Sequence, residues 1–215
     1  MVDEGHELAS HGMRHVRVFR QTPHEFLGDA RQSRMLLEQL GGVRVLGYRA
    51  ATYSIGQRNA WAFEVLGEAG YQYSSSVYPI RHDLYGWPTA SRTPFWPSGV
   101  PGQGVLEIPV ATLQFGQHRI PCGGGGFFRL YPYGVSRWAW RRLNHGEKRP
   151  GVFYFHPWEM DPGQPRIQGI GLKTRFRHYL NLRRMEGRLT ALWRDFQWGR
   201  MDQVFVNEIR VGSLA

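Results

Sequence analysis

Three histidines lie close together near the start of the chain, in the segment Gly5-His6-Glu7-Leu8-Ala9-Ser10-His11-Gly12-Met13-Arg14-His15. His11 and His15 are four residues apart, so on a helical turn both imidazoles would lie on one face and could bind the same divalent metal. His6 would point elsewhere, and the His-Glu-x-x-His protease signature is absent because the second histidine comes one residue too late. The spacing therefore predicts a two-histidine metal site, with two surface histidines as the alternative.

A helix is predicted soon after these histidines. Thr22 can cap it, Pro23 suits the first helical position, and Glu25 completes a capping box. Apolar residues recur at helical spacing up to residue 40, and the pair Gly41-Gly42 ends the helix. This helix is the first element available to position the histidine segment.

Strands and helices are then predicted to alternate. Residues 43–48 are an apolar run typical of a buried strand, which brings Arg49 to its carboxyl end. Residues 60–68 predict a second helix, and residues 71–78 predict another strand. In parallel α/β folds ligands bind at the carboxyl ends of the strands, so Arg49 is expected at such an edge.

Residues 82–104 are predicted to form an irregular surface segment. After it, we expect a strand over residues 105–115, a helix over residues 133–144 and a strand over residues 151–155. Residues 176–196 predict a basic amphipathic helical region. The glycine run 123–126 lacks the Gly-Lys-Ser/Thr ending of a phosphate loop, so it predicts close backbone packing or ligand approach and not nucleotide binding. The basic region predicts a solvated arginine face, and a membrane or nucleic-acid surface is the less favoured alternative.

Composition indicates a globular protein, with 41% hydrophobic and 14% aromatic residues among 215. No apolar run is long enough for a membrane span, and the acidic, polar start is unlike a secretory signal, so a cytoplasmic location is expected. A single cysteine, Cys122, excludes an internal disulfide and a cysteine-based zinc site. The net charge of +10 comes mostly from scattered arginines. We interpret this charge as the result of a genome that favours arginine, and a nucleic-acid partner is the less favoured alternative.

Four motifs, taken in order, resemble the polysaccharide deacetylases of the NodB and chitin-deacetylase type: residues 5–15, Gly47-Tyr48-Arg49-Ala50, Tyr73-Ser74-Ser75-Ser76-Val77-Tyr78-Pro79 and Phe155-His156-Pro157-Trp158-Glu159. Three further motifs are similar to the branch of that family found in bacterial exopolysaccharide loci linked to exosortase and PEP-C-terminal sorting: Gly123 to Leu130, His156 to Pro162 and Phe176 to Leu182. The resemblance covers nearly the whole chain.

The resemblance implies a distorted (β/α) barrel of the NodB type with fewer than eight strands. The implied reaction is hydrolysis of an N-acetyl group on a hexosamine within a polysaccharide or oligosaccharide, assisted by a divalent metal, usually zinc, that activates a water and polarises the amide carbonyl. By the same resemblance, His11 and His15 match the family's two metal-binding histidines.

Four other residues are carried over from the family. His156 matches the histidine acid that protonates the leaving amine, and Arg49 matches the arginine that holds the catalytic carboxylate in place. Trp158 lies where a ring could pack beside His156 or stack on sugar, with packing in the core as the alternative. Tyr78, at the end of its motif, is expected to contact substrate.

The chain departs from the family pattern at three places. The family's first motif is a strand ending in paired aspartates, which supply the third metal ligand and the base, and only residues 1–4 precede the histidine segment here. Asp3 cannot replace that motif, because it belongs to the helix end after the missing strand. Ala51 replaces a proline and Ser74 replaces an aspartate, and both changes are tolerable. We therefore expect a chain without its first β/α unit and with impaired activity.

Two domains are expected, a truncated barrel over residues 1–104 and a family-specific part over residues 105–215 that completes the barrel and carries the His-Pro-Trp-Glu motif. The main alternative to an enzyme is a non-catalytic glycan-binding relic that retains the groove and its aromatic lining. A nucleic-acid-binding module is a weaker alternative, because only the charge favours it.

Overall fold

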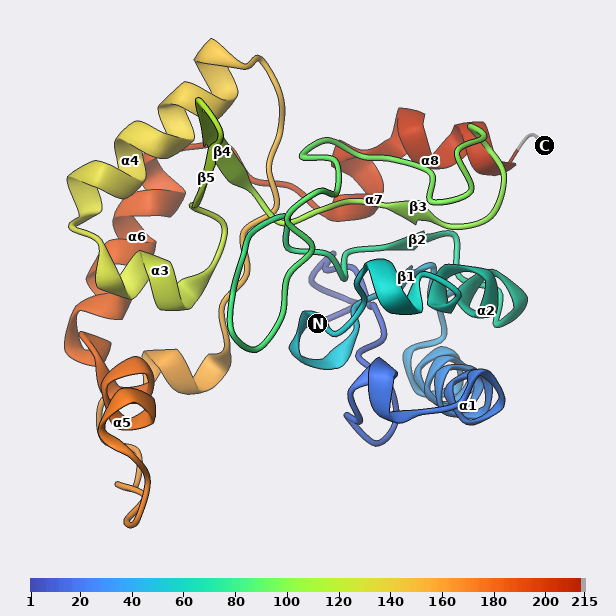
Figure 1. The fold of residues 1–215 in the computed structure, drawn as a ribbon, viewed down its shortest axis with the longest axis horizontal. Helices are drawn as coiled ribbons and strands as arrows, with labels where there is room; N and C mark the ends of the chain where they lie inside the picture. The colour runs from blue at the N-terminus through green and yellow to red at the C-terminus, as the bar shows by residue number, and fades with distance from the viewer. Residues whose placement is uncertain (214–215) are drawn as a thin grey trace. The chain divides into compact units, whose positions relative to one another are not determined.

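The computed structural model describes residues 1–213 and divides into two units. Unit 1 comprises Met1–Val110 and Gly199–Ala215, and unit 2 comprises Ala111–Trp198. The first unit therefore ends a few residues after the expected boundary at residue 104, and it takes back the end of the chain, which the sequence pattern did not predict. Figure 1 shows the elements of each unit, which are described separately below.

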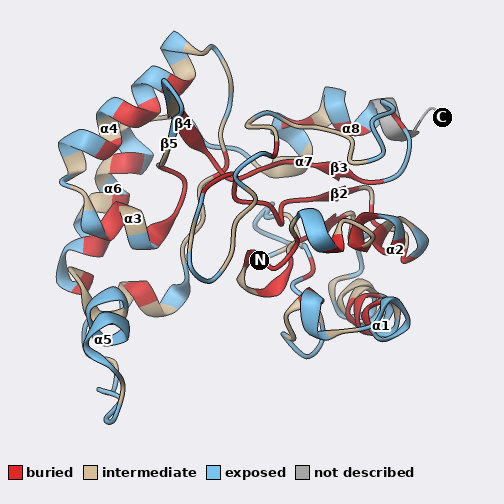
Figure 2. Cartoon of the chain, in the orientation of Figure 1, coloured by how far each residue is buried: buried red, intermediate tan, exposed pale blue. Residues whose placement is uncertain are grey.

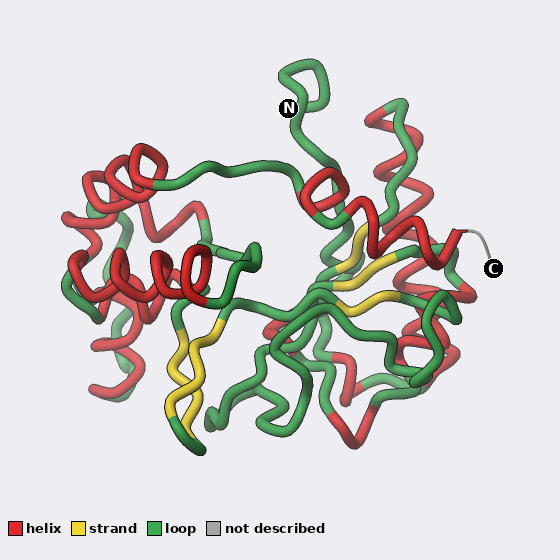
Figure 3. Tube along the Cα trace, turned by 90° about the horizontal axis from the view of Figure 1, so that it is seen from above, coloured by secondary structure: helices red, strands yellow, loops and turns green. Residues whose placement is uncertain are grey.

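Unit 1 is built on a three-stranded parallel sheet in the order β1-β2-β3, made of Gly47–Tyr48, Tyr73–Ser74 and Leu106–Glu107. Gly47 pairs with Tyr73, and Tyr73 with Leu106, so the three strands end at one edge. Ser10 forms a parallel bridge to Tyr48, which places the histidine segment beside β1. Figure 3 shows these strands as short segments between long loops.

Two α-helices accompany this sheet: α1 (Pro23–Gly41) precedes β1, and α2 (Ala62–Glu68) connects β1 to β2. The predicted start of α1 is confirmed, because the Thr22 hydroxyl accepts from the Glu25 N–H while the Glu25 carboxylate accepts from the Thr22 N–H. Gly42 ends the helix in the left-handed conformation, as expected. Short 3-10 helical turns lie in the loops of this unit: η1 (Val18–Arg20) precedes α1, and η2 (Ala51–Tyr53) and η3 (Gln57–Asn59) lie between β1 and α2.

The core of unit 1 is formed by buried apolar side chains from the helices and strands; Phe26 and Ala30 of α1, Tyr48 of β1, Phe63 and Leu66 of α2, and Val105 before β3 are members. Two helices from the end of the chain, α7 (Met201–Val204) and α8 (Val206–Ser213), complete the unit. The Asp202 N–H at α7 donates to the Glu7 carboxylate at 3.1 Å, which joins this end of the chain to the histidine segment.

Unit 2 contains the antiparallel hairpin β4–β5 (Thr112–Phe115 and His118–Pro121) and the helices α3 (Gly125–Leu130), α4 (Tyr133–Arg141) and α6 (Met185–Asp195). The π-helical turn η4 (Arg142–Gly146) extends α4. Short helices η5 (Pro157–Met160), α5 (Leu172–Tyr179) and η6 (Leu182–Arg184) lie in the remaining chain. Its core includes Leu113, Phe128, Trp140, Leu143, Met185, Leu189 and Leu192. Figure 2 shows the buried sides of α3, α4 and α6.

Three predicted elements in the second half differ from the structure. The strand expected over residues 105–115 is divided into β3 and β4, with Pro109 in the break, because a proline cannot donate to a continuous ladder. Residues 151–155 form only isolated bridge positions, at Val152 and Tyr154, the latter paired with Gly124. The helix expected over residues 176–196 is divided into α5, η6 and α6, with Asn181 at φ 52° between the first two.

No helix in the part of the chain that the structure describes combines the length and apolarity required to cross a membrane.

We predict that Thr22→Ala lowers the free energy of unfolding by about 1 kcal/mol, because the first turn of α1 loses its side-chain cap. Thr22→Ser keeps the hydroxyl and is the matched control. Thermal unfolding should show a decrease of about 2–4 °C for the alanine variant only. An equal decrease in both variants would show that the cap does not stabilise α1.

Candidate functional site

The histidine segment runs along the edge of the unit 1 sheet. The Ser10 N–H donates to the Gly47 carbonyl at 2.9 Å, and the Arg49 N–H donates to the Ser10 carbonyl at 2.8 Å. His11 follows immediately, and its Nδ1 lies 2.7 Å from the carbonyl oxygen of Arg49. The strand-like pairing thus brings His11 and Arg49 to the same edge of the sheet.

His11 and His15 come together through a turn and not through the helical turn that their spacing predicts. Their ring centroids are 4.9 Å apart with the ring planes at 70°, while the backbone between them has no helical hydrogen bonds. The buried Asp29 of α1 fixes the turn, because its carboxylate accepts from the N–H groups of Met13 and Arg14 at 2.9 and 3.1 Å. The two rings lie next to each other, as the sequence predicts, but the prediction of a helical turn between them is wrong.

This pair fits two positions in the ligand set of a metal. A carbonyl oxygen can only accept, so His11 Nδ1 carries the proton and the lone pair is on Nε2, the arrangement typical of a metal-binding histidine. Both oxygens of Asp29 are engaged in holding the turn. Among residues 1–213, no three His, Cys, Asp or Glu side chains gather as a metal site. The described residues therefore bring together two candidate ligands, and no third joins them.

An open surface hollow of about 460 Å³ lies beside His15. It is lined by His15, Val16, Arg17, Arg20 and Thr52. The backbone around it adopts left-handed conformations, with φ of 53° at His15 and 57° at Thr52. Such conformations cost roughly 1–3 kcal/mol for residues other than glycine and are concentrated at functional sites, so they favour this hollow as a binding site.

Arg49 is held against the segment that follows β2. Its Nε donates to the Ser75 carbonyl and its Nη2 to the Ser75 hydroxyl, both at 3.0 Å. Its Cζ lies 5.6 Å from the centroid of the Tyr53 ring. The structure thus brings His11 beside the main chain of Arg49, whereas the Arg49 guanidinium is held by Ser75, and its role toward a catalytic carboxylate stays a prediction.

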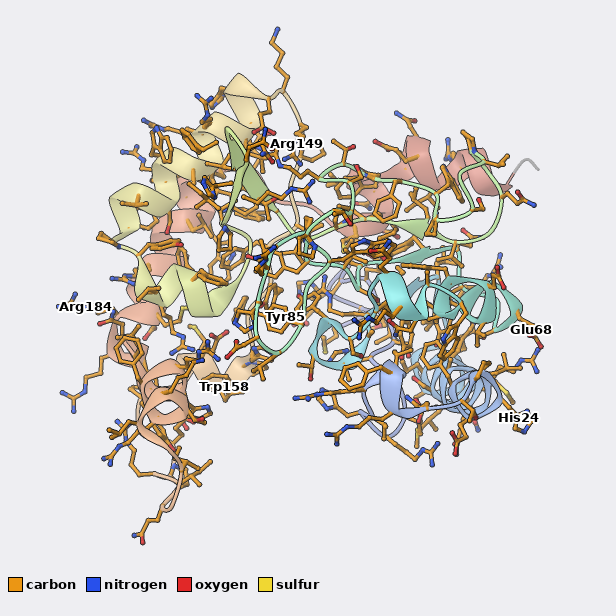
Figure 4. The ribbon with its side chains drawn as sticks, in the orientation of Figure 1. His24, Glu68, Tyr85, Arg149, Trp158 and Arg184 are labelled. Atoms are coloured by element: carbon orange, nitrogen blue, oxygen red, sulfur yellow. The ribbon has the colours of Figure 1, made fainter. Side chains whose placement is uncertain are left out.

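Tyr78 is fully buried, so the structure does not support the expected contact with substrate. Its ring stacks on Tyr85 with the planes 5° apart and packs against Tyr53 at 6.0 Å between centroids. Figure 4 labels Tyr85 in this cluster. Tyr78 supports the aromatic packing behind Arg49.

A buried carboxylate that the sequence analysis missed lies at the end of β3. Glu107 Oε1 accepts from the N–H groups of Ser76 and Val77 at 2.9 and 2.8 Å. It thereby fixes the segment that binds Arg49 through Ser75. Burial raises the pKa of Glu107 to about 7, even though its hydrogen bonds and the charge of Arg49 oppose the shift. The available signal was a single carboxylate within the apolar run of residues 105–110.

Glu107 predicts a pH dependence of stability. Because its pKa is higher in the folded chain than the ordinary value of 4.5, its contribution to stability is fully present below about pH 4.5 and is lost as the pH rises through about 7. Compared with Glu107→Gln, the unsubstituted chain should lose on the order of 3 kcal/mol of unfolding free energy over this interval. Urea unfolding of both proteins at several pH values checks this, and parallel stability curves would contradict it.

In unit 2, His156 is positioned by the carboxylate of Glu159. The His156 N–H donates to Glu159 Oε2 at 2.8 Å, and His156 Nδ1 lies 3.5 Å from the same oxygen. Burial by itself would raise the pKa of Glu159, but hydrogen bonds from His156 and the charge of Arg129 outweigh it and lower the pKa. Glu159 therefore stays ionised at neutral pH beside the exposed ring of His156.

Arg129 is the buried partner of this carboxylate. Its Nε donates to Glu159 Oε1 at 2.9 Å, and its other nitrogens donate to the main-chain carbonyls of Arg177, His178 and Leu180 at 2.8–3.1 Å. A buried ion pair is stable only when such additional hydrogen bonds satisfy both groups. The pair links the His156 segment to α3 and to the end of α5.

Trp158 packs between side chains of the same network. Its ring stacks on His178 at 4.2 Å between centroids with the planes 14° apart, and on His156 at 5.6 Å. Burial and the charge of Arg129 lower the pKa of His178, which favours a neutral ring in this stack. Figure 4 labels Trp158 within unit 2. His178 covers Trp158 where the sequence analysis expected packing or contact with sugar.

The glycine run has a specific packing role in this unit. A Cβ on Gly125 would overlap both carboxylate oxygens of Glu159, so only glycine lets α3 approach the buried carboxylate. The alternative of close backbone packing, left open by the sequence, is the one that the structure supports. Glu159 was within a recognised motif, but its partner Arg129 carried no sequence signal beyond its place in the glycine-rich motif.

We predict that Gly125→Ala destabilises the protein by about 1–3 kcal/mol, because Arg129 and His156 prevent the carboxylate from moving away. Gly126→Ala is the matched control, since a Cβ there meets open space within the same helix. Urea unfolding measures both variants. Equal unfolding free energies of the two variants would show that the Glu159 side chain can move to admit a Cβ without loss of stability.

Two family models match the chain. The model described as polysaccharide deacetylase matches residues 1–74, and the model described as a domain of unknown function, DUF3473, matches residues 75–206. A search of curated proteins found no match.

Solved structures share the fold at low sequence identity. A putative polysaccharide deacetylase from Mycobacterium smegmatis superposes with a TM-score of 0.53 at 20% identity, covering 99% of this chain and 65% of that one. A probable polysaccharide deacetylase from Pseudomonas aeruginosa PAO1 gives a TM-score of 0.55 at 16% identity, over 98% and 61% of the two chains. The Puue allantoinase gives 0.53 at 18%, over 100% and 61%. The chain therefore spans less than two thirds of the length of each of these relatives.

Proposed function

We propose that this chain, which belongs to the DUF3473 family by its match over residues 75–206 and matches the polysaccharide deacetylase model over residues 1–74, is a hydrolase that removes N-acetyl groups from hexosamine residues of a bacterial exopolysaccharide. The observation that supports the proposal is the pair of rings of His11 and His15, with His11 bound to the Arg49 carbonyl and His15 lining the hollow of unit 1. We further propose that the parallel strands of unit 1 belong to a distorted (β/α) barrel with fewer than eight strands.

His11 and His15 are proposed to hold a divalent metal, with zinc as the first candidate, because neutral imidazoles are common zinc ligands. Such a metal supplies Lewis-acid chemistry toward the carbonyl of an amide substrate. The Arg49 carbonyl orients the His11 ring through Nδ1, while the Arg49 side chain is fixed by Ser75. In this proposal the Arg49 guanidinium orients a carboxylate that acts as the base.

His156 is proposed to act as the general acid. In amide hydrolysis the oxygen of water adds to the carbonyl carbon, the C–N bond breaks, and the departing nitrogen must receive a proton, so that acetate and a free amine result. The exposed His156 ring can carry that proton, and the Glu159 carboxylate lies 3.5 Å from its Nδ1, which orients the ring. Trp158 is proposed to support the ring at the substrate side.

The paired-aspartate motif of the family is proposed as the source of the base and of the third metal ligand. Asp29 does not replace it, because both of its oxygens bind main-chain N–H groups of the histidine turn. We therefore expect residues 1–215 to release acetate slowly or not at all, and the same residues preceded by a strand that ends in paired aspartates to release it readily.

A second candidate function is glycan binding without catalysis. It is favoured by the incomplete ligand set, since the described residues bring together only two candidate metal ligands. Under this alternative, an N-acetylated oligosaccharide binds equally well with and without a chelator, and added aspartates do not produce acetate.

The test measures acetate released from N-acetylglucosamine oligomers by the extended chain with added zinc. His11→Ala and His156→Ala should each lower kcat/KM by at least about 100-fold, because one removes a proposed metal ligand and the other the acid. His24→Ala, an exposed histidine at the start of α1 that is labelled in Figure 4, is the matched control and should retain full activity.

Two outcomes contradict parts of the proposal. Full activity of His156→Ala would show that another group protonates the amine. Activity that survives both a chelator and His11→Ala would show that the histidine pair holds no metal in the reaction. Chelator-insensitive binding of the oligomers without acetate release would favour the glycan-binding alternative.

A further inference from the structure

A continuous stretch of unit 2 carries positive charges only. Between Asp161 and Glu186 the sequence contains no acidic residue, and its six charged residues are Arg166, Lys173, Arg175, Arg177, Arg183 and Arg184. All six are exposed, and Figure 4 shows Arg184 extending from the surface of the unit. The stretch itself contributes no carboxylate, so its own charges are all positive.

The helix α5 within this stretch also exposes large apolar side chains. Leu172 is 85% exposed, Phe176 is 57% exposed, and Ile167 in the preceding loop is 58% exposed. α5 has no buried residue, and Figure 2 shows it in the colour of exposed residues over most of its length. A helix that buries nothing gains no stability from a core, so these apolar groups lack a structural explanation within the unit.

The side chains of α5 are arranged as on a helix that lies in a membrane interface. Leu172 and Phe176 are four residues apart and share one face. At 100° per residue, Lys173 and Arg175 lie roughly 80° to either side of the centre of that face. Cations therefore flank the apolar stripe on both sides.

The C-terminal end of α5 attaches the helix to the unit. His178 stacks on Trp158 and contacts Gln164 Oε1 at 2.8 Å. The Tyr179 hydroxyl accepts from the Ile167 N–H at 2.8 Å, and Arg166 lies over the Tyr179 ring at 4.1 Å. These contacts place Ile167 and Arg166 next to α5, so the loop and the helix form one surface. Figure 1 shows α5 at one end of its unit, away from α4 and the β4–β5 hairpin.

We propose that this surface, defined by Arg166, Ile167, Leu172, Lys173, Arg175 and Phe176, docks on a bilayer that contains anionic lipids. The cations complement the negative headgroups, and the three apolar side chains enter the boundary between headgroups and acyl chains. A nucleic acid or an anionic polysaccharide would pair with the cations alone and would leave Leu172 and Ile167 in water. The exposed apolar stripe is the observation that favours lipid over these polymers.

This docking surface is independent of the proposed deacetylation. Attachment through such a surface is peripheral and reversible. It would hold the protein at the surface of a bilayer without inserting a segment through it. Its test requires neither metal nor substrate.

The test is cosedimentation of the full chain with vesicles of phosphatidylglycerol and phosphatidylcholine, and with vesicles of phosphatidylcholine alone. We expect binding to the anionic vesicles that weakens as salt is added, and little binding to the neutral ones. Lys173→Gln with Arg175→Gln should weaken partitioning roughly thirtyfold. Leu172→Ser with Phe176→Ser should also reduce it at least about tenfold, because the apolar contribution is lost.

The matched control is Leu40→Ser with Arg44→Gln, which removes an exposed leucine and an exposed arginine from unit 1 and should leave partitioning unchanged. Unchanged unfolding temperatures confirm that all variants fold. Failure of the parent chain to bind anionic vesicles overturns the proposal. Full binding by the Leu172/Phe176 variant, together with complete competition by soluble heparin, also overturns it and assigns the surface to a polyanion.

Discussion

Buried carboxylates that must find hydrogen-bond donors shape the candidate site in both units. An ionised carboxyl group in an apolar interior is stable only when donors surround it, and main-chain N–H groups of loops are the available donors. Asp29 binds the turn between the two histidines, Glu107 binds the segment that holds Arg49, and Glu159 binds the N–H of His156. Each carboxylate thereby fixes a loop that carries or supports a residue proposed to act in the reaction.

Glu159 and Glu107 differ in how their charge is compensated, and this difference sets their protonation. Glu159 accepts hydrogen bonds from His156 and has the buried Arg129 at 2.9 Å, and together these keep its pKa low despite burial. Glu107 has mainly main-chain donors, and burial dominates its pKa. Unit 2 therefore offers a permanent anion beside His156, whereas the support of Arg49 in unit 1 titrates near neutral pH.

Local signals in the sequence predicted local structure well. The capping box at Thr22 and the glycines after residue 40 define α1 without reference to any distant residue, and both are present. The apolar positions Leu182, Met185, Leu189 and Leu192 are buried as their spacing indicates. The strands were overestimated, because apolar runs show burial but not pairing, and the ladders β1, β2 and β3 contain two residues each. The resemblance placed the histidines and Arg49 together, but the turn that joins His11 to His15 depends on Asp29, which lies on another element.

The order of the chain has a consequence for its synthesis. Unit 2 is continuous in sequence, whereas unit 1 is completed only by residues after Trp198, where the Asp202 N–H meets the Glu7 carboxylate. On the ribosome, every contact of unit 2 can form while the first 110 residues still lack α7 and α8. These early residues must wait with part of their apolar surface uncovered, the situation in which nascent chains recruit chaperones. The discontinuous unit, and not the inserted one, is therefore expected to set the pace of folding in the cell.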